Sequence, residues 1–247
     1  MLKHHKLISF CLALLFLIVL QKFATPVPIF RFLVPAFLAF AAIATAYNYW
    51  YLKQIEKYNF WILIRPLLLL IASFGVFLVM PATFLSGLFL IIDVVIITIV
   101  EILLGNTAEN ILLNETLLIA FGLFVALFGA YWYAASFEPF YLMAIFAGSS
   151  LLARSFYEAV PQPAEVKLAG SIIIGLLCSE LYWVLNFLQL HYSALALILF
   201  NLFYFCLVTN YYYLFHNLNF KKIQFQLLFM LACLVLIVAT TPWSIAQ

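Results

Sequence analysis

The chain has 247 residues, of which 68% are hydrophobic and 8% are charged, and its formal net charge is +2. A soluble domain is about 45–50% apolar and about 25% charged, so this composition excludes a soluble globular protein and predicts one whose surface faces lipid. The small, scattered positive charge gives no indication of a nucleic-acid partner. We expect the lipid bilayer to surround the chain.

Hydrophobic runs separated by Pro, Asn, Gly and charged residues predict nine membrane-spanning helices, since one span needs about 20 mainly apolar residues. In chain order these runs are 7–23, 29–50, 60–80, 82–104, 112–134, 139–158, 168–188, 194–215 and 223–243. We therefore predict an all-α, polytopic transmembrane helix bundle. Residues 1–247 would form a single integral membrane domain, without a soluble domain.

The first run could also be read as a signal peptide. The basic start MLKHHK precedes an apolar stretch of about the length of a signal-peptide core. No A-x-A cleavage pattern follows, so we expect an uncleaved first helix. Cleavage would leave eight spans.

The distribution of Lys and Arg predicts the orientation, because cytoplasmic loops carry an excess of both. With the N-terminus inside, Lys22 and Arg31 fall outside, and all other basic residues fall inside. The inside residues are Lys3, Lys6, Lys53, Lys57, Arg65, Arg154, Lys167, Lys221 and Lys222. This asymmetry predicts an N-in, C-out, multi-pass protein, located in the cytoplasmic (plasma) membrane if the protein is bacterial.

Small residues recur at every fourth position of the fifth span. Gly122, Ala126, Ala130 and Ala134 fall on one helix face, where a neighbouring backbone can approach closely. This stripe predicts helix–helix packing and does not indicate a catalytic or binding site.

Two acids lie inside apolar spans, Asp93 in the fourth and Glu180 in the seventh, both about halfway along. A central acid costs roughly 2.5–3.5 kcal/mol on insertion scales, which the surrounding apolar residues outweigh. Burial favours the neutral carboxyl. If the two acids face each other, they can share and exchange protons, as a proton-coupled transporter requires. The alternative is structural: each acid holds helices together through hydrogen bonds to hydroxyls or amides.

A second polar group is expected near the cytoplasmic edge and comprises Arg65, Glu101, Arg154 and Glu158. Arg65 lies near the cytoplasmic end of the third predicted span, and Glu101 lies near the same end of the fourth, which makes them plausible partners. Arg154 and Glu158 are an i,i+4 pair on one helix face. The group is either a polar vestibule or a belt of solvated interfacial charges, and we favour the belt.

Signatures of membrane enzymes are missing from the sequence. It contains no H-E-x-x-H or G-x-S-x-G motif, and its four cysteines and four histidines are scattered, so we expect no metal site and no cofactor. We do not expect an enzyme. Of three candidate functions, a small transporter or permease, in a proton-linked form, ranks first. A non-catalytic component that forms a homo-oligomer or binds a partner membrane protein comes second, and a lipid-modifying enzyme third.

Overall fold

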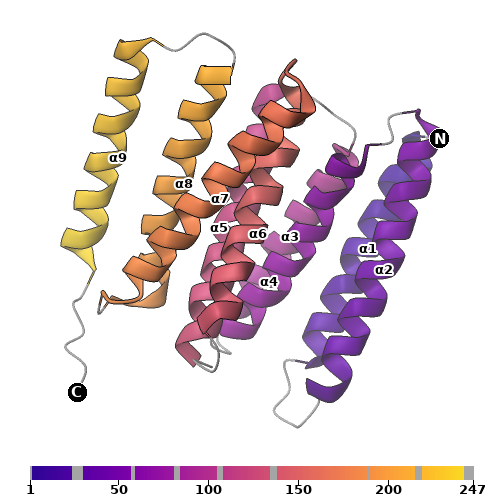
Figure 1. Cartoon of the computed structure of the whole chain (residues 1–247). Coiled ribbons are helices and arrows are strands. Elements are labelled where there is room, and N and C mark those ends of the chain that lie inside the picture. Colours follow the sequence, from indigo (N-terminus) through magenta and orange to yellow (C-terminus); the bar gives the residue numbers. More distant parts are fainter. Residues whose placement is uncertain are drawn as a thin grey trace.

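The computed structural model describes residues 2–23, 30–56, 59–80, 84–104, 108–133, 138–188, 190–214 and 219–241. These residues form nine α-helices and one 3-10 turn, without a strand, which confirms the predicted all-helical architecture. The helices lie side by side with their axes roughly parallel (Figure 1). They are α1 (Leu2–Phe23), α2 (Phe30–Gln54), α3 (Phe60–Val79), α4 (Phe84–Ile102), α5 (Glu109–Tyr133), α6 (Glu138–Phe156), α7 (Ala164–Leu185), α8 (Tyr192–Leu214) and α9 (Phe220–Thr240).

Within the described part of the chain, five helices are long and apolar enough to cross a membrane. They are α3, α5, α7, α8 and the segment Ile223–Thr240 of α9. Large apolar side chains cover much of the outer surface, and α9 shows this most clearly, with Phe225, Leu228 and Val235 each more than 60% exposed. Such a surface is stable in lipid and unfavourable in water. Helix length, apolar composition and this surface therefore indicate a helical membrane protein, while the count of nine spans stays a prediction.

Successive helices alternate in direction, so α1 begins at the upper end of Figure 1 and α9 ends at the lower end. The basic residues Lys53, Arg154, Lys167 and Lys221 lie in the last turns of α2 and α6 and the first turns of α7 and α9. Because successive helices run in opposite directions, the ends of α2 and α6 and the starts of α7 and α9 lie at the same end of the bundle. This arrangement accords with the positive-inside pattern, and the N-in orientation itself stays a prediction.

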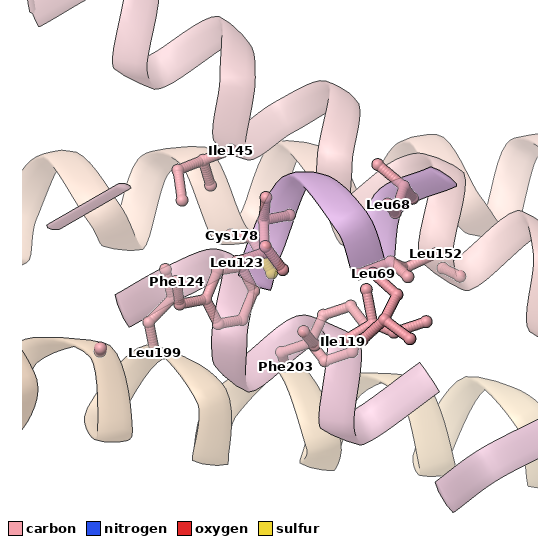
Figure 2. Packing of buried hydrophobic residues seen from close by; sticks show 14 of the residues in the cluster. Leu68, Leu69, Ile119, Leu123, Phe124, Ile145, Leu152, Cys178, Leu199 and Phe203 are labelled. Carbon is pink, nitrogen blue, oxygen red and sulfur yellow. The ribbon is translucent and has the colours of Figure 1, made fainter. Parts of the chain in front are cut away.

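The core is centred on α5, which packs against α3, α6 and α8. Figure 2 shows Phe124 of α5 with Leu69 of α3, Ile145 of α6 and Phe203 of α8 pointing into a common interior. The rings of Phe124 and Phe203 meet edge to face, with centroids 5.6 Å apart. Helices α7 and α9 join this centre through α6 and α8, and the outer group of α1, α2 and α4 joins it mainly through α3.

The contact between α3 and α5 is close because small residues face each other. A Cβ placed on Gly75 would lie 2.5 Å from Cβ of Ala126, and one placed on Gly122 would lie 3.3 Å from Cβ of Ala72. Gly122 and Ala126 of the predicted stripe thus lie against α3, and Ala130 is partly buried. Ala134 lies outside the described residues. Close backbone approach replaces the hydrophobic effect as the force that joins helices within lipid.

Candidate functional site

Asp93 is the middle residue of α4 and its side chain is 4% exposed. The hydroxyl of Ser73, about two thirds of the way along α3, donates a hydrogen bond of 2.6 Å to Oδ1 of Asp93. An apolar helix tolerates an acid at this depth when a hydrogen bond compensates part of the lost solvation. The sequence predicts this acid at the middle of its helix, as the structure has it, but gives no indication of Ser73 as its partner.

Asp93 also lines a cavity of about 400 Å³ between α3, α4, α5 and α8. The cavity extends from Asp93 to Met80 beyond the end of α3 and to Tyr192 and Ser193 at the start of α8. Because α3 ends and α8 begins at the same end of the bundle, the cavity runs from the middle of the bundle toward that end. Among the described residues that line it, Asp93 is the only charged one.

Glu180 does not share this site. Its side chain is exposed on the outer face of α7, in a shallow groove whose other wall includes Leu142 and Met143 of α6. No hydrogen bond or ion pair to Glu180 is found within the described ranges. The helix also differs from the predicted span 168–188, since α7 begins directly after Pro163 and ends at Leu185. Glu180 therefore lies five residues, or about 8 Å, from the helix end. It lines a groove between α6 and α7, whereas Asp93 lines the cavity between α3, α4, α5 and α8, so the two carboxyls do not face each other.

The structure corrects the expected partner of Arg65. Instead of Glu101, the guanidinium contacts Glu115 of α5, with Nη1 and Oε2 2.6 Å apart, and both side chains are buried. The reason is that α3 packs far more extensively on α5 than on α4. Nε of Arg65 and Oε1 of Glu115 are buried without a hydrogen-bond partner.

Glu101 belongs to a separate cluster between α1, α2 and α4. Its Oε1 accepts a hydrogen bond of 2.9 Å from Nδ2 of Asn48, and its main-chain oxygen lies 2.9 Å from Nε2 of His5. Because a carbonyl oxygen only accepts, Nε2 of His5 carries the proton, and a neutral ring then accepts at Nδ1 from the hydroxyl of Tyr47, 2.8 Å away. The His5 ring stacks on Tyr51 with centroids 3.5 Å apart.

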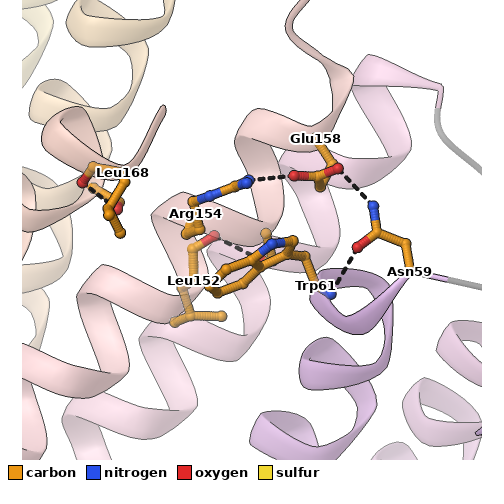
Figure 3. A network of polar contacts seen from close by, with 8 residues as sticks. Asn59, Trp61, Leu152, Arg154, Glu158 and Leu168 are labelled. Carbon is orange, nitrogen blue, oxygen red and sulfur yellow. Dashed lines mark hydrogen bonds and ion pairs between the residues drawn. The ribbon is translucent and has the colours of Figure 1, made fainter. Parts of the chain in front are cut away.

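The third cluster joins the end of α6 to the start of α3 (Figure 3). Arg154 pairs with Glu158 as the i,i+4 spacing predicts, and its guanidinium lies 4.4 Å from the centroid of the Trp61 ring. Asn59 caps α3: Oδ1 accepts from the Trp61 amide at 3.0 Å while Nδ2 donates to Glu158 at 2.6 Å. Each of these contacts crosses from one helix to another or closes a helix end.

The residues expected at the cytoplasmic edge therefore form three separate clusters. Arg65, Glu101 and Arg154 are each less than 7% exposed. This burial contradicts the belt of solvated charges that we favoured from the sequence. The clusters instead lie between helices, at the end of the bundle opposite the one toward which the Asp93 cavity extends.

No known protein family, curated protein or solved structure matches this chain.

Proposed function

We propose that this protein is a proton-linked membrane carrier in which Asp93 is the group that exchanges protons. One observation carries the proposal: a carboxyl at the centre of α4 is buried in the bundle and also lines a cavity that runs to one end. A carboxyl in that position can load or release a proton as the cavity changes the side to which it opens.

The packing supports an alternating movement. Helices α1, α2 and α4 contact one another and join the remaining helices mainly through α3. The cavity lies along this boundary, with Asp93 on α4 and Ser73 on α3. The Arg65–Glu115 pair ties α3 to α5 inside the larger group, so it braces that group and does not cross the boundary. A rocking motion of α1, α2 and α4 against the rest would break few contacts.

The second candidate is a non-catalytic component that assembles with a partner membrane protein. Its support is Glu180, a charged side chain on the outer, lipid-facing surface of α7. Its position about 8 Å from the helix end lets the carboxyl extend toward the headgroups instead, so the carrier is the function that we propose.

Sided thiol labelling tests the carrier. After replacement of Cys11, Cys178, Cys206 and Cys233, a single cysteine at Asp93 is treated with a membrane-impermeant reagent in right-side-out and inverted vesicles. We expect labelling from both sides, because a carrier exposes its central group to each side in turn. A cysteine at Ile92, which is exposed on the outer face of α4, is the control and should stay unlabelled. Labelling of a folded Asp93→Cys protein from one side only, or from neither, would overturn the proposal.

A further inference from the structure

The cavity beside Asp93 combines one acid with an apolar wall. We infer that it binds a lipophilic amine, a molecule with an apolar body and a single ammonium group. The inference rests on the proposed function, because it names the class of molecule that the carrier would move.

The charge of the cavity selects a cation. Asp93 is the single charged group among the described lining residues, and Ser73 occupies only Oδ1. An anion would meet a carboxylate in a low-dielectric space, whereas an ammonium donates a charge-assisted hydrogen bond to it. The rings of Phe89, Phe121 and Tyr192 also line the cavity, and aromatic faces attract organic cations. Phe89 is one helical turn before Asp93, so both lie on the same face of α4.

The lining argues against a metal ion or a highly polar substrate. A hard cation such as calcium takes six to eight oxygen ligands, and the described residues hold no group of three His, Cys, Asp or Glu side chains suited to a metal. A sugar needs many donors and acceptors, but the polar side chains of the wall are those of Ser73, Asp93, Tyr192 and Ser193. Leucine, isoleucine, valine and phenylalanine form most of the remainder. Such a wall suits an apolar body.

Size and access fit the same class of molecule. The cavity volume of about 400 Å³ falls within the range of about 300–1,000 Å³ that holds small organic ligands. Leu118 and Phe121 of α5 line the cavity and are also exposed on the outer surface. A molecule dissolved in the bilayer can therefore reach Asp93 past α5. When the ammonium binds, the carboxyl proton leaves to water, so one positive charge replaces another.

Calorimetry on the full chain in lipid nanodiscs tests the inference with naphthylmethylamine and its neutral isostere naphthylmethanol. Empty nanodiscs correct for partition into lipid. We expect the amine to bind roughly tenfold tighter or more, and Asp93→Asn to remove the difference. The control Glu180→Gln, which removes an acid outside the cavity, should keep it. Equal binding of the two compounds to the unaltered protein would overturn the inference.

A second measurement keeps Asp93 in place. A single cysteine at Ser73 reports on the same cavity, and naphthylmethylamine should slow its labelling several-fold while naphthylmethanol should not. Equal protection by the two compounds, or none, counts against the amine. The carrier proposal fails separately, through one-sided labelling at position 93. A protein that labels from both sides but does not distinguish the two compounds is a carrier for another class of substrate.

Discussion

Replacing Glu115 with leucine is expected to lower the free energy of unfolding by about 3–5 kcal/mol, because it leaves Arg65 charged and buried without its partner. The guanidinium has no neutral form at accessible pH, and its Nε is already without a hydrogen-bond partner. Arg65→Met should cost less, since the Glu115 left behind can bind a proton and become neutral. The measurement is unfolding of the purified protein by sodium dodecyl sulfate, followed by loss of helical circular dichroism.

The double variant is the control for this prediction. Arg65→Met combined with Glu115→Leu removes both charges and fills the space with apolar atoms, so we expect most of the stability of the original protein to return. If Glu115→Leu unfolds at the same denaturant concentration as the original protein, the 2.6 Å contact does not hold α3 to α5. If the double variant is less stable than either single variant, the pair is not coupled in the way that the geometry indicates.

Gly75→Ala should lower the free energy of unfolding by about 1–3 kcal/mol, the range typical of overpacking. The added methyl would lie 2.5 Å from Cβ of Ala126. Ala126 has no rotamer with which to move away, so the α3 and α5 backbones must separate. The same unfolding measurement in detergent detects the loss.

Gly87 supplies the matched control for the glycine prediction. It also lies within a helix, and a Cβ added there meets no atom within 4 Å. Gly87→Ala is therefore expected to be neutral, or stabilising by up to about 1 kcal/mol through helix propensity. Equal behaviour of the two alanine variants would show that α3 and α5 do not approach each other as closely as the structure has them.

The sequence was enough to predict the number of described helices and the place of Asp93 at the middle of its helix, because hydropathy and helix punctuation are local properties. It did not suffice for pairings between helices. Sequence order makes Glu101, on the next helix in the chain, a plausible partner of Arg65, whereas the glycine and alanine contacts between α3 and α5 bring Glu115 to it. One signal was present: α3 carries Ala72 and Gly75, two small residues suited to the stripe that contains Gly122 and Ala126.

Glu180 illustrates a second limit, the position of helix ends. Hydropathy placed the seventh span at 168–188, but the helix begins right after Pro163, because proline readily precedes or opens a helix. The shift moves Glu180 from mid-depth to the neighbourhood of the helix end. Only the packing of α7 on α6 then determines that its side chain faces outward. Ser73 was overlooked for a related reason, since a serine in an apolar helix has no recognisable partner before the helices are placed.

The most direct measurement for the role of Asp93 is an infrared titration of the protein in lipid. The hydroxyl of Ser73 donates a hydrogen bond to this carboxyl. Tyr192 and Ser193 line the same cavity, with the Tyr192 hydroxyl 3.4 Å from the main-chain oxygen of Val79. We expect a band of the protonated carboxyl that appears and disappears reversibly with pH, is lost in Asp93→Asn, and persists in Glu180→Gln. Glu101 and Glu115 are present in every variant, so their infrared bands cancel when the spectra of two variants are subtracted. Identical pH-dependent spectra for the original protein and Asp93→Asn would contradict a proton-exchanging Asp93, and with it the carrier.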